Sequence, residues 1–231
     1  MDLQEHHSNS SFERERINNT MHSLISILIC VLIGYCFGCF STAYFVGKLH
    51  GIDIRNEGSG NLGSTNALRT LGAKAGLMTF AGDILKTVIP ISIFRIVYHG
   101  QGDFVLVLAM WMGLGVVLGH NFPFWLHFKG GKGIAVTAAV ILVTAEWPIM
   151  VAGILIFAVI VGITRYVSLG SLVASFYLFA NVLIFHRDSP QIVQLTVVSL
   201  VFAAMAFFQH RGNIVRLING TERKVGEKKE K

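Results

Sequence analysis

Long apolar runs separated by short polar breaks dominate the pattern along this chain. No charged residue occurs from Ile17 to Gly47, which leaves enough chain for the roughly 20 residues that cross a bilayer as a helix. Six further apolar segments follow, of which the third and fourth are the shortest; they cover residues 76–98, 103–121, 133–147, 148–164, 167–186 and 191–209. The pattern predicts an all-α integral membrane protein with seven transmembrane helices.

Polar sequence flanks the apolar region on both sides. We expect residues 1–22 to form a polar disordered tail, residues 23–217 to form the membrane domain and residues 218–231 to form a charged cytoplasmic tail. The first apolar run exceeds the roughly 7 to 15 residues of a cleaved signal sequence, so it indicates a spanning helix instead.

Basic residues are distributed unequally between the two predicted sides of the membrane. Of the 19 Lys and Arg residues, 14 fall on one side and 4 on the other, and Lys86 lies within a predicted span. Because cytoplasmic loops are enriched in Lys and Arg, this distribution places the N-terminus outside and the C-terminus in the cytoplasm.

Composition supports the membrane assignment and narrows the choice of ligand. Hydrophobic residues make up 53% of the chain and charged residues only 14%, whereas soluble domains carry about 25% charged residues. The net charge of +6 fits a membrane surface or an anionic ligand. We expect no nucleic-acid partner, because so little polar surface remains.

Two glycine-rich stretches with basic residues fall on the predicted cytoplasmic side. Residues 51–69 combine glycines with Ser, Thr and Asn side chains and include Arg69, while residues 119–133 end in glycines around Lys132. Glycines let backbone N–H groups converge on an anion, and hydroxyl, amide and cationic groups add donors for phosphate oxygens. The sequence therefore predicts a phosphate site at the membrane surface.

Two other polar segments border the same surface. Residues 165–171 carry two serines at the start of an apolar run, and residues 209–226 follow the last one. His210 and Asn213 are three positions apart, so they share one face if the helix continues. The aromatic residues within 122–128 are typical of interfacial anchors.

Asp83 and Lys86 are charged residues inside the second predicted span. Charges within spans are rare and are generally paired or functional. The sequence leaves two alternatives open, a mutual ion pair or a support for the adjacent loops.

Four motifs, in this order on a seven-span chain, resemble the bacterial PlsY-type acyl-phosphate:glycerol-3-phosphate acyltransferases. The resemblance covers residues 30–226 and rests on GSGNLGSTNALR (58–69), GHNFPFWLHFKGGKG (119–133), RYVSLGS (165–171) and HRGNIVRL (210–217). The chain departs from the family at residues 38–41, where the usual GSxP is GCFS, and at Ser64, where Ala is usual.

The resemblance implies a site residue by residue. It implies catalytic roles for Ser59, Arg69, Lys132 and His210, with His210 either a base or a phosphate ligand. It also implies a set of substrate-binding positions, namely Gly60, Asn61, Thr65, Asn66, Gly130, Gly131, Ser171 and Asn213.

The resemblance also implies the reaction, in which a fatty acyl group moves from acyl phosphate to glycerol 3-phosphate to give lysophosphatidic acid and phosphate. The expected setting is the bacterial cytoplasmic (inner) membrane, with membrane lipid around the helices and the site on the cytoplasmic side. No cofactor and no obligate protein partner are expected. No metal is expected either, since the sequence lacks the run of metal-binding aspartates that is typical of the CDP-alcohol transferases. A membrane anion or phosphate transporter is the alternative.

Overall fold

The computed structural model describes residues 21–100 and 102–227, and regular structure in these residues is entirely helical. An apolar helix over residues 21–38 comes first. The remaining helices follow along the chain as α2 (Thr42–Leu49), η1 (Ile54–Asn56), α3 (Ser64–Leu71), α4 (Ala73–Val97), α5 (Asp103–Asn121), η2 (Phe124–Leu126), α6 (Ile134–Thr144), α7 (Trp147–Thr164), α8 (Val167–Ala174), α9 (Tyr177–Phe185), α10 (Ile192–Gln209) and α11 (Arg211–Ile218).

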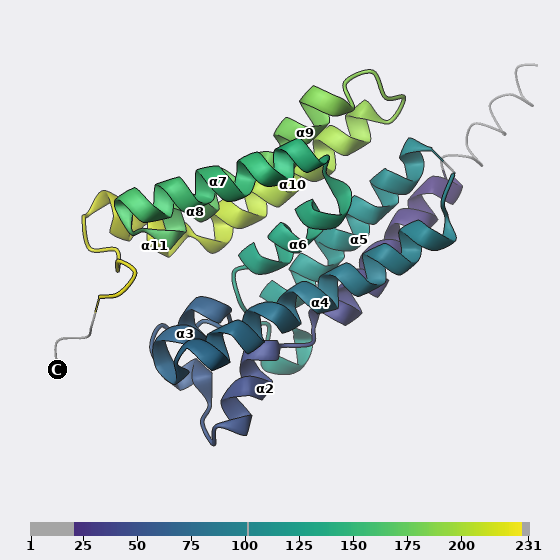
Figure 1. The fold of residues 1–231 in the computed structure, drawn as a ribbon. Coiled ribbons are helices and arrows are strands. Elements are labelled where there is room, and N and C mark those ends of the chain that lie inside the picture. Colours follow the sequence, from purple (N-terminus) through teal and green to yellow (C-terminus); the bar gives the residue numbers. More distant parts are fainter. Residues whose placement is uncertain (1–20, 101, 228–231) are drawn as a thin grey trace, which may run out of the picture.

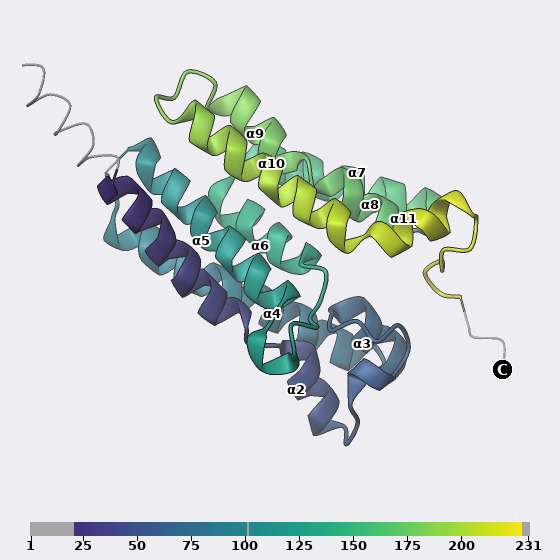
Figure 2. The same cartoon turned by 180° about the vertical axis from the view of Figure 1, so that it is seen from behind.

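The long helices form two layers (Figures 1 and 2). The first layer holds the N-terminal helix, α4, α5 and α6, and the second holds α7, α8, α9 and α10. Contacts of α10 with α5 and of α6 with α7 join the layers. The short helices α2, α3 and α11 lie toward one end of the molecule, where the glycine-rich stretches also lie.

Six of the seven predicted spans are long and apolar enough to cross a membrane, namely Met21–Leu49, Ala73–Val97, Asp103–Leu126, Trp147–Thr164, Val167–Phe185 and Ile192–Gln209. The segment predicted over 133–147 is instead the 11-residue helix α6. At 1.5 Å per residue α6 rises about 16 Å, roughly half the hydrocarbon thickness of a bilayer.

The ends of α6 explain its length. Gly133 precedes the helix with φ +81°, a left-handed conformation that suits glycine. At the other end the Thr144 hydroxyl donates to Val140 O at 2.7 Å, and the Glu146 N–H donates to Asn181 Oδ1 at 2.9 Å. The side-chain amide of Asn181 in the other layer therefore fixes the turn into α7. The hydropathy of residues 133–147 does not reveal this contact.

Two other spans are interrupted. The first breaks at residues 39–41, and the Trp125 indole donates to the freed Cys39 carbonyl at 2.8 Å. Trp125 therefore does more than anchor the membrane interface, because it supplies a hydrogen bond to a backbone carbonyl that the break leaves without a helical partner. The span over 167–186 is divided between α8 and α9, where the Ser175 hydroxyl donates to Leu172 O at 2.6 Å.

The interface between the first helix and α5 is built from glycines on both sides. A Cβ at Gly34 or Gly38 would lie within 3.0 Å of the backbone of Met112 or Val116. Conversely, a Cβ at Gly115 or Gly119 would overlap the backbone of the first helix. Small residues four apart allow such close approach of membrane helices, so the backbones of the first helix and α5 pack directly against each other.

Candidate active site

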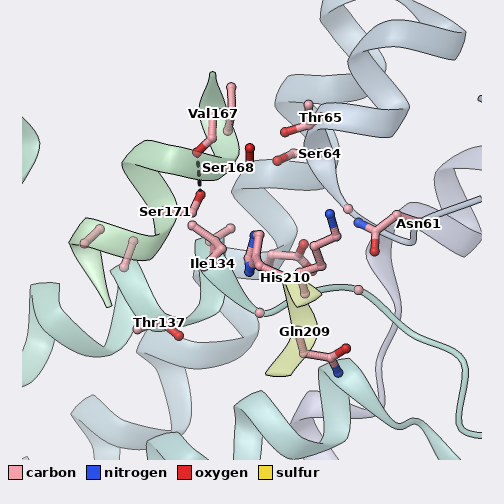
Figure 3. Close-up of a pocket in the computed structure, with 18 of the residues that line it drawn as sticks. Asn61, Ser64, Thr65, Ile134, Thr137, Val167, Ser168, Ser171, Gln209 and His210 are labelled. Atoms are coloured by element: carbon pink, nitrogen blue, oxygen red, sulfur yellow. Dashed lines mark hydrogen bonds between the residues drawn. The ribbon is translucent and has the colours of Figure 1, made fainter. Parts of the chain in front are cut away.

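A cavity of about 1160 Å³ opens where α3, α4, α6, α8 and α11 converge. All of the predicted site residues line it: Ser59, Gly60, Asn61, Thr65, Asn66, Arg69, Gly130, Gly131, Lys132, Ser171, His210 and Asn213. In Figure 3 the hydroxyls of Ser64 and Thr65 on α3, those of Ser168 and Ser171 on α8, and the His210 ring surround one space. The fold therefore brings the four motifs together.

The first loop is organised by Asn66, which is 2% exposed. Its Oδ1 accepts from the Ser59 N–H at 2.9 Å and from the Ser59 hydroxyl at 3.1 Å, and its Nδ2 donates to Glu57 O at 3.1 Å. The amide of Asn66 is thus fully used within the loop. We expect Asn66 to shape the loop and to hold Ser59 at the cavity.

The second loop folds back onto the end of α5. The N–H groups of Gly130 and Gly131 donate to Asn121 O and His120 O, both at 3.0 Å. Those two donors are therefore engaged. Side chains at Gly130 and Gly131 would overlap α5, so glycine at these positions lets the loop lie against the helix. The N–H groups of Gly133, Ile134 and Ala135, at the start of α6, have no acceptor within the described chain, as is usual for a first helical turn.

Lys132 lies between these groups and α11. Its Nζ donates to Asn213 Oδ1. Burial, opposed by nearby Glu222 and reinforced by Arg216 and Arg69, lowers the pKa of Lys132 to about 8. Lys132 is therefore mostly protonated at neutral pH, but less firmly than an exposed lysine.

His210 sits between α10 and α11 and is 3% exposed. Its Nδ1 lies 2.8 Å from Ala206 O. Since a carbonyl only accepts, Nδ1 carries the proton and Nε2 keeps a lone pair. Burial, opposed by the Ala206 carbonyl, lowers the pKa of His210 to about 4, so the ring is neutral at pH 7 and Nε2 is an acceptor.

Glu222 is a site residue that the sequence did not reveal. Its Oε1 accepts from Ser168 Oγ at 2.9 Å and from Asn213 Nδ2 at 2.6 Å, and its Oε2 accepts from Arg216 Nε at 2.7 Å. Burial raises the pKa of Glu222, but these hydrogen bonds outweigh burial and lower it below its usual range. The chain reaches this position through Gly220, with φ +68°, so part of the predicted tail belongs to the site.

Cationic and hydroxyl groups occupy the rest of the polar end. Arg69 lies exposed in the last turn of α3, and its guanidinium forms no hydrogen bond with the described residues. Ser171 is 1% exposed, and its hydroxyl donates to Val167 O at 2.8 Å, which leaves its oxygen as an acceptor. The polar end of the cavity thus offers an anion one ammonium group, together with a guanidinium and N–H groups that no described residue engages.

The opposite arm of the cavity is apolar. It runs between α4, α6 and α7 and reaches the start of α9, with side chains that include Ile84, Ile141, Leu142, Ile154, Phe157 and Tyr177. The described residues contain no group of three or more His, Cys, Asp or Glu side chains arranged to hold a metal ion. The cavity therefore pairs an anion-binding end with an apolar arm.

Comparison with known proteins agrees with this geometry. The glycerol-3-phosphate acyltransferase family model matches residues 28–220. A glycerol-3-phosphate acyltransferase of Clostridioides difficile (strain 630) is 42% identical over 209 residues, covering 90% of this chain and 99% of the relative. One of Thermoanaerobacter sp. (strain X514) is 41% identical over 204 residues, covering 88% and 98%.

A solved structure gives the same result for the fold. The crystal structure of PlsY, an integral membrane glycerol 3-phosphate acyltransferase in its glycerol 3-phosphate form, matches with a TM-score of 0.75 and 34% identity. The match covers 87% of this chain and 96% of that one. The protein described here therefore belongs to the glycerol-3-phosphate acyltransferase family.

Proposed function

We propose that this protein transfers a fatty acyl group from acyl phosphate to glycerol 3-phosphate, releasing phosphate and forming lysophosphatidic acid. The observation that carries the proposal is the single cavity in which an anion-binding end meets an apolar arm. Both substrates bear a phosphoryl group, while only the acyl donor and the product bear a long chain. PlsY, which is similar to this chain, was crystallised in a glycerol 3-phosphate form and in a lysophosphatidic acid form.

The proposed step is a direct transfer. The glycerol hydroxyl oxygen attacks the acyl carbonyl carbon, a new C–O ester bond forms, and the bond from that carbon to the phosphate oxygen breaks. Lys132, Arg69 and the free N–H groups at the start of α6 stabilise the charge on the departing phosphate. An acyl phosphate is already activated, so an acyl-enzyme on Ser59 or Ser171 would offer little advantage.

The proton of the attacking hydroxyl must also leave. His210 Nε2 is positioned as an acceptor, so we propose that it binds and orients this hydroxyl. A phosphate group has a second pKa of about 6, whereas the pKa of His210 is about 4. The departing phosphate is therefore the stronger base, and we propose that it takes the proton.

The transporter alternative has weaker support. Transporters place broken helices and charged side chains near the middle of the membrane. Here the charges within the described spans that could serve this purpose, Asp83 and Lys86, are buried and form an ion pair at 2.9 Å.

A direct assay tests the reaction. Purified protein receives acyl phosphate and labelled glycerol 3-phosphate without metal, and a parallel sample receives the acyl-coenzyme A thioester as donor. We expect lysophosphatidic acid from acyl phosphate only. A complete lack of product with acyl phosphate would refute the proposal, and a stoichiometric acyl adduct by intact mass, formed without acceptor and chased into product, would refute direct transfer.

We further propose seven passages through the membrane, with α6 and its flanking loops as a short one, the N-terminus outside and the C-terminus and cavity in the cytoplasm of the bacterial inner membrane. The support is the distribution of Lys and Arg along the chain. Single cysteines at Asn56 and Asp188, with Cys30, Cys36 and Cys39 replaced by Ala, test the orientation. An impermeant thiol reagent should label only position 188 in sealed cells, and labelling of position 56 would reverse the topology.

A further inference from the structure

Three buried polar side chains form a chain next to Gly131 in the second glycine-rich stretch. Asp83 and Lys86 belong to α4, and His120 lies in the last turn of α5. Their side chains are 1%, 4% and 5% exposed. Lys86 Nζ lies 2.9 Å from Asp83 Oδ1, 2.8 Å from Phe40 O and 2.8 Å from His120 Nδ1. The mutual ion pair, one of the two alternatives that the sequence left open, is thus present, and it has a third member.

The hydrogens available on Lys86 determine the state of His120. An ammonium group has three N–H donors and no acceptor, and three atoms of the described residues lie within hydrogen-bond distance of Lys86 Nζ. His120 Nδ1 must therefore accept, so the neutral ring carries its proton on Nε2. Thr42 donates to Asp83 Oδ1 at 3.2 Å, which holds the carboxylate that balances the charge of Lys86.

The Nε2 side of His120 faces the glycine-rich loop. A Cβ at Gly131 would overlap His120 Nε2, and His120 lines the same cavity as Lys132. Within the described chain no acceptor is recorded for Nε2. Nε2 is not among the buried polar atoms that lack a partner, so it is accessible from the cavity that His120 lines. The anion-binding end of the cavity is the place where a partner would come.

We propose that His120 is a further phosphate ligand of this site, donating its Nε2 hydrogen beside Gly131, and that Asp83 and Lys86 are positioning residues that hold the required tautomer. This inference rests on the proposed function, because it adds a contact to the same site. The two site histidines then have opposite roles: Nε2 of His210 accepts from the substrate hydroxyl, and Nε2 of His120 donates to a phosphoryl oxygen.

A matched pair of substitutions at His120 separates the two ring nitrogens. In His120→Gln the amide nitrogen falls near the position of Nε2 and keeps a donor at the loop, whereas in His120→Asn the amide reaches only the position of Nδ1. Binding of glycerol 3-phosphate and of inorganic phosphate is measured by calorimetry on purified protein without acyl donor. We expect His120→Asn to weaken binding about tenfold and His120→Gln to weaken it less than about threefold. Equal affinities in the two variants would overturn the inference.

The positioning role has its own test. The double variant Asp83→Leu/Lys86→Met removes both charges together, which buried pairs tolerate far better than loss of one partner. We expect a melting temperature near that of the wild type but a phosphate affinity about tenfold lower. Wild-type affinity in the folded double variant would show that the ion pair serves packing alone. Thr79→Val on the same helix is the control and should bind normally, because the buried Thr79 hydroxyl has no hydrogen-bond partner among the described residues.

A spectroscopic measurement covers the case in which the double variant does not fold. Ring ¹⁵N chemical shifts distinguish a protonated Nε2 from a protonated Nδ1, and we expect His120 of the wild-type protein to show the proton on Nε2. A proton on Nδ1 would overturn the inference. Failure of the proposed reaction is distinguishable, because the two binding experiments contain no acyl donor and report on the anion contact alone.

Discussion

Helices α5 and α7 are both apolar and long enough to span a membrane, yet they lie in opposite surroundings. In an apolar stretch of 18 residues from each span, 72% of the residues are buried in the α5 span and only 6% in the α7 span. Glycines on α5 meet the backbone of the first helix, whereas Gly162 on α7 has open space around it. Apolar side chains therefore serve packing in α5 and contact with lipid in α7, and hydropathy alone does not separate these uses.

The sharpest way to break the comparison is to enlarge one glycine on each helix. Gly115→Leu would drive a side chain into the Val31 carbonyl, and we expect the free energy of unfolding to fall by more than about 3 kcal/mol. Gly162→Leu is the matched control and should leave the melting temperature in detergent within a few degrees. Similar melting temperatures for the two variants would mean that α5 and the first helix do not pack closely.

The next largest effect is expected at the loop that α5 holds in place. Lys132→Gln removes a charge-assisted hydrogen bond to phosphate of about 1.5 to 3 kcal/mol, so activity should fall roughly ten- to a hundredfold. Lys74→Gln, a lysine outside the cavity at the start of α4, is the control and should retain activity. Unchanged kinetics in Lys132→Gln would reduce Lys132 to a topological anchor.

The same residue predicts a dependence on pH. The pKa of Lys132 is lowered to about 8, so the charged form that binds phosphate is lost as the pH rises through this value. We expect kcat/KM to fall up to about tenfold per pH unit above 8. Lys132→Arg keeps its charge throughout this range, so it should lower the rate but remove this alkaline fall. The same fall in Lys132→Arg would assign it to another group.

The smallest effect is expected on α7, at its one buried residue, Gly153. A Cβ there would lie 2.7 Å from the Tyr177 ring, so Gly153→Ala should push the ring into the apolar arm. We expect the rate with long acyl donors to fall several-fold relative to short ones. Gly162→Ala on the same helix is the control, and an unchanged ratio of rates would place the acyl chain elsewhere.

The sequence was sufficient for six of the seven spans and for several of the polar residues that line the cavity. Long apolar runs identify most spans without tertiary information, because a helix needs about 20 residues to cross the hydrocarbon layer. The motifs pointed to one region because each places glycine or polar residues where an apolar run ends. All of the predicted site residues line the cavity, although their individual roles stay predictions.

Features that depend on contacts between distant segments were not predictable. The end of α6 depends on Asn181, and the engaged N–H groups of Gly130 and Gly131 depend on how the loop folds back on α5. Glu222 resembled any other charge in a solvated tail, since the turn at Gly220 that returns it to the site has no hydropathy signal. The sequence showed that Asp83 and Lys86 needed partners, but not that Lys86 reaches His120.

The position of Glu222 has a consequence for biosynthesis. Ser168, Asn213 and Arg216 all use this one carboxylate, and it is translated after every helix described in the structure. A chain that ended just before residue 222 would still contain all of its apolar segments, so its insertion into the membrane would be complete. Its anion site would still be incomplete, so competence for insertion and competence for catalysis arise at different moments of synthesis.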